Sequence, residues 1–231
     1  MAKYRHLVLA AVSVLVLGTP AGAAYAAAAH PAAAKPVLTI GKKGGPAVKK
    51  GAVLKASLAR RASANFALGT FKATCKSSSL TAKVTGNPSR PGKATLSVTR
   101  QAFGRCSLKR APSGVTLKSI SAFNLPYNAI VSDAKGDPVT VTGSKKSKPL
   151  GFKAVIKLGK MRLTCAYTAA KASGHASNSG NKVSFANQKF VLNTHLSSQL
   201  CAAAAKTATL SATYGPVLDT SVSHSPKVFV S

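Results

Sequence analysis

The sequence lacks glutamate and tryptophan altogether, and its only acids are Asp133, Asp137 and Asp219. Against these three stand 33 lysines and arginines, so the 231 residues carry a formal net charge of +30 at pH 7. Acid/base hydrolysis of sugars needs two converging carboxylates, and sites for hard cations need several oxygen ligands. The shortage of acids therefore excludes most hydrolytic and metal chemistry. The lack of tryptophan disfavours sugar binding by ring stacking.

The excess of positive charge does not make the chain a disordered polycation. Hydrophobic residues account for 45% of the sequence, which is ordinary for a globular protein. A chain of this length buries about 70% of its surface on folding and needs no metal to do so. We therefore expect a folded protein that uses no metal and no cofactor.

Residues 1–26 have the features of a secretory signal peptide. Lys3 and Arg5 form a basic start, and the apolar run Leu7–Leu17 is too short to span a membrane. Ala24-Tyr25-Ala26 then provides the small residues of a cleavage site, with a transmembrane anchor as the alternative interpretation. Cleavage leaves 31 basic residues and three aspartates, a charge of +28 on 205 residues. We expect a secreted, extracellular protein, with or without association to the cell wall, and no membrane span in the mature chain.

An internal repeat organises the remaining sequence. The segments Leu68–Cys75 and Leu158–Cys165 both follow the pattern Leu-Gly-x-apolar-basic-x-Thr-Cys, at an offset of 90 residues. Pro126 and Pro216 match at the same offset, and each half ends in a proline followed by a short strand-like run. We interpret this ordered series as a tandem duplication.

The repeat divides the chain into successive parts. These are a signal peptide (1–26), a flexible Ala/Pro leader (27–36), a first β half with an opening segment (37–143), a connection (144–153) and a second β half (154–231). The opening segment is expected to add strands to the first half. Because the connection is short, we expect the halves to share a core or to pack as one unit, with two independent domains as the alternative.

The four cysteines, Cys75, Cys106, Cys165 and Cys201, predict two disulfides in an exported protein. Their spacing does not match the close pairs of a zinc site. If the halves are equivalent, each closes its own disulfide, which pairs Cys75 with Cys106 and Cys165 with Cys201. The alternative pairs Cys75 with Cys165 and Cys106 with Cys201, which requires equivalent strands of the two halves to meet.

Hydrophobic residues recur with the period of a β-strand. Phe152, Ala154, Ile156 and Leu158 alternate with basic or smaller residues, and threonine and serine fill many intervening positions. Turn signals separate such runs at roughly ten-residue intervals. The predicted fold is an all-β, disulfide-stapled sandwich or barrel built from two related halves.

Several motifs along residues 37–231 point to a known group of proteins. They are Gly51–Leu58, Thr74–Ser79, Asn87–Gly92, Asn124–Asn128, Thr164–Tyr167, Ser184–Gln188, Ser211–Val217 and Ser225–Val230. They are distributed along essentially the whole of residues 37–231, and they resemble uncharacterised secreted all-β proteins of actinobacteria that are often labelled Tat pathway signal sequence domain proteins. The resemblance implies an exported β-rich fold and no particular activity. Members of that group are less rich in lysine, so this chain differs from the group in its high positive charge.

A search for catalytic motifs finds none. Asp133 and Asp137 lie in a segment with the composition of a hairpin turn, and no Gly-x-Ser-x-Gly nucleophile motif accompanies His175, His195 or His224. The segment Gly41-Lys42-Lys43-Gly44-Gly45 lacks the order of a phosphate-binding loop. We therefore expect a protein without catalytic activity.

Charge gives the strongest functional expectation. Residues 42–110 contain 16 lysines and arginines and no acid. The clusters expected to contact a ligand are Lys42, Lys43, Lys49, Lys50, Arg60, Arg61, Lys109 and Arg110, joined by Lys145, Lys146 and Lys148. Self-repulsion on this scale destabilises a compact state, and partner anions relieve it.

We therefore expect binding to anionic polymers such as wall teichoic acid or nucleic acid. Because lysine predominates over arginine, that binding is expected to show little sequence specificity. The alternatives are a structural or surface protein without a specific ligand, and an enzyme or enzyme inhibitor that uses unrecognised loops. The oligomeric state stays open.

Overall fold

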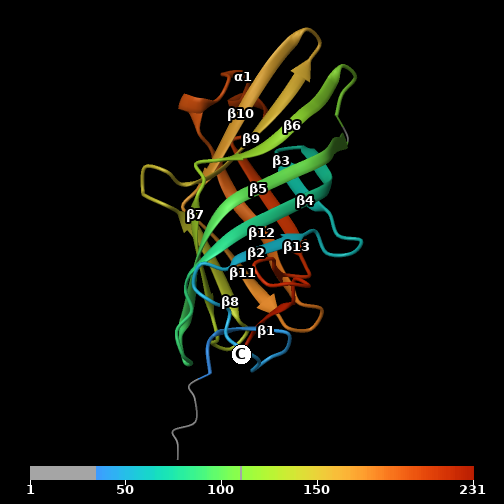
Figure 1. Cartoon of the computed structure of the whole chain (residues 1–231). Coiled ribbons are helices and arrows are strands. Elements are labelled where there is room, and N and C mark those ends of the chain that lie inside the picture. The colour runs from blue at the N-terminus through green and yellow to red at the C-terminus, as the bar shows by residue number, and fades with distance from the viewer. Residues whose placement is uncertain (1–34, 110) are drawn as a thin grey trace, which may run out of the picture. The chain divides into compact units, whose positions relative to one another are not determined.

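Eight strands close into a barrel, and further strands extend from it (Figure 1). The structure is a computed structural model that describes residues 35–109 and 111–231. It contains 63% strand and 4% helix. The all-β prediction is confirmed, and of the two predicted architectures the barrel is the one that forms.

Strands are distributed along the whole described region. They are β1 (Leu38–Ile40), β2 (Val53–Ser57), β3 (Ala64–Leu68), β4 (Phe71–Gly86), β5 (Lys93–Lys109), β6 (Val115–Phe123), β7 (Tyr127–Ser132), β8 (Pro138–Gly143), β9 (Leu150–Leu158), β10 (Met161–Ala169), β11 (Lys171–Ser177), β12 (Lys182–Leu192), β13 (Thr207–Tyr214), β14 (Leu218–Asp219) and β15 (Val228–Val230). Between β12 and β13 lie the 3-10 turn η1 (Thr194–Leu196) and the short helix α1 (Leu200–Ala204).

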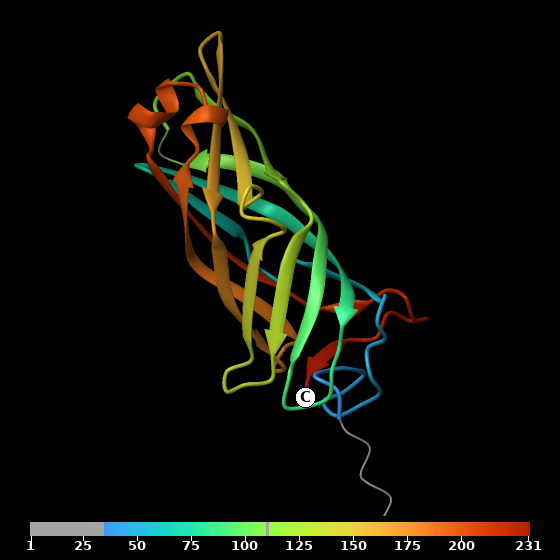
Figure 2. The same ribbon diagram turned by 90° about the vertical axis from the view of Figure 1, so that its left-hand side faces the viewer.

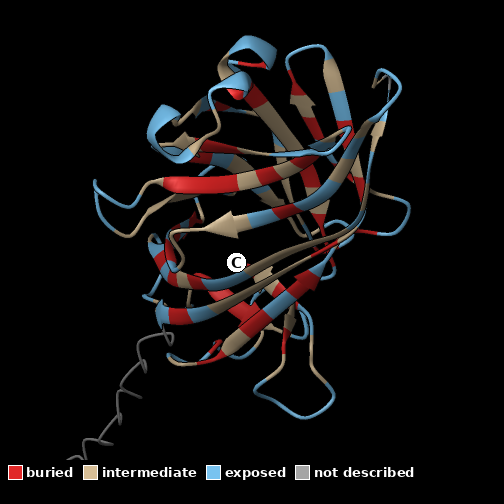
Figure 3. Ribbon diagram, turned by 90° about the horizontal axis from the view of Figure 1, so that it is seen from above, coloured by how far each residue is buried: buried red, intermediate tan, exposed pale blue. Residues whose placement is uncertain are grey.

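The barrel is an antiparallel ring in the order β11-β8-β7-β5-β4-β3-β13-β12, which closes where β12 pairs with β11. From β12 the sheet continues outward through β10, β9 and β6. On the other side β2 pairs with both β4 and β14. Buried and exposed residues alternate along the strands, as the period-two pattern requires (Figure 3).

The two halves complete each other's sheets. Strand β3 of the first half pairs with β13 of the second, and β9 of the second half pairs with β6 of the first. The two Leu-Gly motifs that revealed the repeat form equivalent hairpin turns, in which Gly69 has φ +61 and Gly159 has φ +57. Left-handed backbone of this kind favours glycine. Residues 35–109 and 111–231 accordingly belong to one compact unit.

An aromatic cluster joins the halves at the core. The ring of Phe66 from β3 lies 4.9 Å from that of Phe152 from β9 and 5.2 Å from that of Phe103 (centroid distances). Phe152 also contacts Tyr167 and Phe190, at 5.3 and 5.0 Å. Since all five side chains belong to one hydrophobic cluster, the first and second halves share a single core.

Both disulfides form within a half, as the repeat predicted. Cys75 and Cys106 are direct cross-strand partners in β4 and β5, with their Cα atoms 3.9 Å apart. Cys165 of β10 bonds to Cys201 of α1, with a Cα separation of 5.6 Å. The crossed pairing is therefore wrong.

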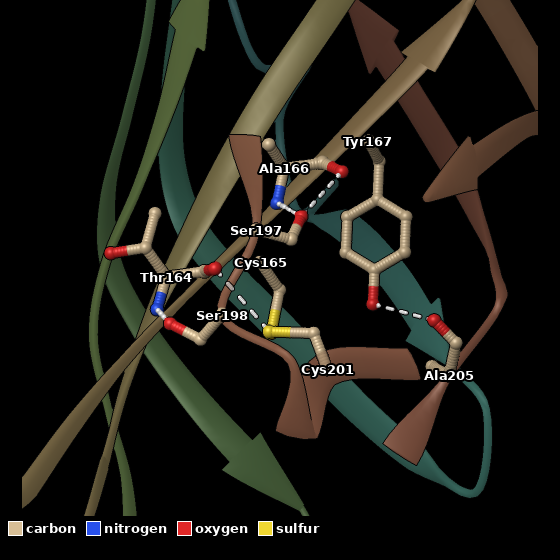
Figure 4. Close-up of a disulfide and its surroundings, with 8 residues drawn as sticks. All are labelled: Thr164, Cys165, Ala166, Tyr167, Ser197, Ser198, Cys201 and Ala205. Carbon is tan, nitrogen blue, oxygen red and sulfur yellow. Dashed lines mark hydrogen bonds between the residues drawn. A yellow bond between two sulfur atoms is a disulfide. The ribbon is translucent and has the colours of Figure 1, made fainter. Parts of the chain in front are cut away.

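The segment around Cys201 provides hydrogen-bond partners for backbone groups on the free edge of β10 (Figure 4). The Ser198 hydroxyl accepts a hydrogen bond from the N–H of Thr164 (3.1 Å), and that of Ser197 accepts one from the N–H of Ala166 (2.9 Å). The Tyr167 hydroxyl donates to the carbonyl of Ala205 (3.2 Å), and burial raises its pKa to about 12. These contacts attach α1 to the end of the barrel opposite β1 (Figure 2).

Asparagine side chains hold a two-stranded ribbon, β1 with β15, at the other end of the barrel: Asn181 donates to the carbonyl of Val228, and two others make paired bonds. Asn87, in the β4–β5 turn, accepts from the N–H of Leu38 and donates to its carbonyl, both at 2.8 Å. Asn178, in the β11–β12 turn, makes the same pair of bonds with Val230 at 2.9 and 2.6 Å. Leu38 and Val230 are cross-strand partners, so the two asparagines bind opposite edges of the same residue pair.

Some boundaries between the parts of the chain differ from those expected from the sequence. Residues 150–153 belong to β9 rather than to a connection, because the alternating pattern already includes Phe152. The opening segment does not serve the first half alone, since β1 pairs with β15 of the second half. Lys35 and Pro36, expected in the leader, contact residues 89–90 through backbone bonding. The predicted signal peptide 1–26 and leader residues 27–34 lie outside the described residues.

We predict that Asn87→Ala and Asn178→Ala each lower the free energy of unfolding by about 2–4 kcal/mol, because each leaves ribbon N–H and C=O groups without partners. Urea unfolding of the oxidised protein measures the loss. Asn65→Ala is the matched control, since this exposed side chain bonds only at the surface. Equal losses in all three variants would contradict the ribbon's dependence on the two asparagines.

Candidate polyanion-binding surface

The three aspartates neutralise little of the positive charge. Among the described residues one ion pair forms, between Arg90 and Asp133, with an Nε–Oδ2 distance of 2.9 Å. The backbone N–H of Gly92 and the Arg90 side chain hold the pKa of Asp133 below its usual range. Asp219 is buried and accepts a hydrogen bond from the N–H of Ser221. The remaining aspartate, Asp137, lies in the β7–β8 turn, where burial raises its pKa.

Like charges face each other directly across two strand pairs. Lys72 of β4 lies opposite Lys109 of β5, and Lys157 of β9 lies opposite Arg162 of β10. All four side chains are exposed. Like charges in direct cross-strand positions destabilise a sheet, so stability alone does not favour these pairs.

The residues predicted to bind polyanions do not form one patch. Lys42, Lys43, Lys49, Lys50, Arg60, Arg61, Lys109, Lys145, Lys146 and Lys148 are all exposed, and Arg110 lies outside the described residues. The first four occupy turns between β1 and β2, and the arginine pair lies in the β2–β3 loop. Lys109 ends β5 near the opposite end of the barrel, and the last three lie in the β8–β9 loop on its side (Figure 1).

The β8–β9 loop contributes to a cationic depression of the surface, which we call the lysine hollow. Its lysines are Lys145, Lys146, Lys171 and Lys189, and none of its lining residues is acidic. The hollow has a volume of about 630 Å³. It spans the junction of the halves, because the loop follows β8 whereas the other two lysines project from β11 and β12.

Short contacts determine where the loop places its lysines. The N–H of Lys148 donates to the carbonyl of Lys145 (2.9 Å), and the Asn124 side chain donates to the carbonyl of Pro149 (3.1 Å). Gly143 lies so close to Lys148 that a Cβ there would be 2.0 Å from its carbonyl oxygen. Only glycine therefore fits at the start of the loop.

Sequence reasoning missed half of the hollow. Lys171 and Lys189 have no basic neighbour in the sequence, so a search for charge clusters passes over them. The available signal was their position on the outward side of an alternating strand. That signal becomes useful only once β8 is known to pair with β11, with Lys171 opposite Thr142.

A second cationic depression lies at the β9–β10 hairpin. It has a volume of about 360 Å³ and is lined by Lys118, Lys157, Lys160, Met161 and Arg162. Lys118 lies where the β6–β9 register shifts between Leu117 and Ser119. A bulge of this kind redirects a side chain, here into the group formed by the hairpin. None of these four basic residues was among the predicted contacts.

The histidines of the described residues lie in separate elements of the fold. No group of three or more His, Cys, Asp or Glu in residues 35–109 and 111–231 has a geometry that could bind a metal ion. His175 lies in β11, His195 in η1 and His224 in a turn. No helix of the described region is both long and apolar enough to cross a membrane.

Comparison of the chain with protein-family models, curated proteins and solved structures finds no match. The resemblance to secreted actinobacterial proteins therefore stays a prediction.

We predict opposite effects of Lys157→Glu on stability and on binding. An acid opposite Arg162 replaces repulsion with attraction, so the free energy of unfolding should rise by about 0.5–1 kcal/mol at low salt. Affinity for duplex DNA should fall, because a cation is lost from the hairpin group. Thermal unfolding and fluorescence anisotropy measure the two effects.

The control is Lys206→Glu, which changes the net charge equally at an exposed position between α1 and β13. It should lower affinity without a comparable gain in stability. The gain in Lys157→Glu should shrink in 1 M NaCl, where exposed charges are screened within about 3 Å. A gain that persists there would contradict the electrostatic explanation.

Proposed function

We propose that this chain is a secreted, non-catalytic protein that binds anionic extracellular polymers, such as wall teichoic acid or nucleic acid, by largely non-specific electrostatic attraction. The observation that carries the proposal is the set of basic groups that face one another without acids, in the lysine hollow and across β4–β5 and β9–β10. Selection for a stable sheet alone would remove such pairs.

The distribution of these groups favours a polymer over a small anion. Basic groups lie in the turns near β1, in the lysine hollow and at the β9–β10 hairpin, so a single phosphate would reach only one of them (Figure 1). A chain with repeated phosphates would contact several at once, and each contact would release counterions. Lysine ammonium groups act as point charges, which supports attraction without base readout.

A structural or surface role without a ligand is the second candidate. Lysines on outward strand positions keep their ammonium groups in water while their stems cover apolar surface, and they discourage edge-to-edge aggregation. This explanation accounts for isolated lysines such as Lys83 and Lys227, which project singly from the sheet or beside it. It gives no reason for four lysines to converge in one hollow.

We predict that log K for duplex DNA falls linearly with log salt at a slope near −4.5, if about five phosphates are neutralised. Affinity should then fall roughly a thousandfold between 0.1 and 0.5 M salt. Replacing the four lysines of the hollow with glutamine should make the slope shallower by about one for each of them that contacts a phosphate. Titrations monitored by anisotropy, with DNA and with teichoic acid in parallel, provide the test.

The control variant replaces with glutamine four exposed lysines from outside the hollow, namely Lys83, Lys93, Lys206 and Lys227. It has the same net charge as the test variant and should change the slope by less than one. Absence of binding to both polymers at low salt would refute the proposal. Equal losses in the two variants would assign the binding to net charge rather than to the hollow.

A further inference from the structure

The interior of the barrel is incompletely filled. A cavity of about 120 Å³ lies between the two sides of the ring. Its walls include the buried side chains of Leu54, Leu96, Val131, Val139 and Tyr214. Packed protein interiors contain few voids larger than a water molecule, so a space of this size is a distinct feature of the fold.

A second cavity, of about 80 Å³, adjoins the first. Leu80 and Val98 line both spaces, and Phe103, Phe185 and Phe190 enclose the second one. For comparison, an apolar cavity of about 150 Å³ engineered into another protein stays dry and binds benzene. The two spaces together therefore have room for one ring or a short hydrocarbon chain.

Alanines on the inward side of the strands leave this space open. Ala56, Ala82, Ala129 and Ala176 all line the first cavity, on β2, β4, β7 and β11. Eight-stranded barrels have interiors that larger side chains just fill, or that hold one small ligand. Here the small residues come from strands of both halves and leave the first cavity unfilled.

The polar groups around the cavity indicate the chemistry of its occupant. The Tyr214 hydroxyl is already bonded to Ser78 and Gln101, at 3.0 and 3.3 Å. No acidic residue lines the wall, whereas the exposed lysines Lys55 and Lys182 lie at its rim. The interior accepts an uncharged hydrocarbon group, and the rim favours an anionic end.

We propose that the barrel binds a small amphiphile whose hydrocarbon part, of about six to eight carbons, occupies the apolar cavities while its anionic end lies beside Lys55 and Lys182. This site is inside the barrel, and it is independent of the polyanion-binding surface. Burial of the hydrocarbon provides the affinity, and the rim lysines orient the molecule.

The test uses the full disulfide-bonded protein with methyl-labelled leucine and valine and two probes, octanoate and octanol. Both probes should shift the methyl NMR signals of Leu80 and Val98, which line both cavities. Octanol is uncharged, so its binding cannot come from attraction to the basic surface. Failure of both probes to shift these signals at millimolar concentration would overturn the proposal.

Filling the cavity should abolish binding. Ala129→Leu and Ala82→Leu each place a larger side chain in the first cavity and should weaken octanol binding at least tenfold, with an unchanged or higher Tm. Ala203→Leu, at an exposed position of α1, adds the same volume outside the barrel and should bind normally. Unchanged octanol affinity in both folded cavity variants would overturn the proposal.

The rim is tested by Lys182→Gln. Octanoate affinity should fall about threefold at low salt, in the range of a surface ion pair, whereas octanol affinity should not change. An equal response of the two probes would overturn the assignment of the anionic end to the rim. DNA binding of Ala129→Leu should match that of the unmodified protein, which separates this site from the proposed polymer-binding function.

Discussion

Closure of the barrel across its two halves is the constraint on which the other features depend. Neither half contains a closed sheet, because the ring is completed only where β3 pairs with β13 and β8 pairs with β11. The rings of Phe66 of β3 and Phe152 of β9 also meet in the shared core. The lysine hollow and the interior cavity both take residues from both halves, so each exists only in the closed barrel.

The charge of the chain opposes this closure. Self-repulsion destabilises a compact state of high net charge, and here like charges even face each other within the sheet. Two disulfides and a shared aromatic core offset the repulsion, the disulfides by restricting the unfolded chain. The protein therefore keeps its positive charge at a cost in stability, which is a reason to look for anionic partners.

The sequence predicted the features that depend on local patterns. Alternation gave the all-β fold, and the repeated Leu-Gly-x-x-x-x-Thr-Cys segments gave the disulfide pairing through the equivalence of the halves. Contacts between residues distant in the sequence could not be predicted. Asn87 and Asn178 were recognisable only as turn residues, because their partners Leu38 and Val230 lie 49 and 52 residues away. Only two of the four lysines of the hollow were predicted, for the same reason. Lys171 comes to the same depression as Lys145 because β11 pairs with β8, which the sequence does not reveal.

We propose that the excess positive charge of the folded chain is complementary to a polyanion. Thermal unfolding with inorganic polyphosphate, against NaCl at equal ionic strength, tests it most directly. Both additions screen self-repulsion, but only a ligand of the folded state adds stabilisation by mass action. The account predicts a higher Tm in polyphosphate than in NaCl, with the difference reduced in the variant that lacks the four lysines of the hollow. Equal Tm values in the two solutions would contradict it.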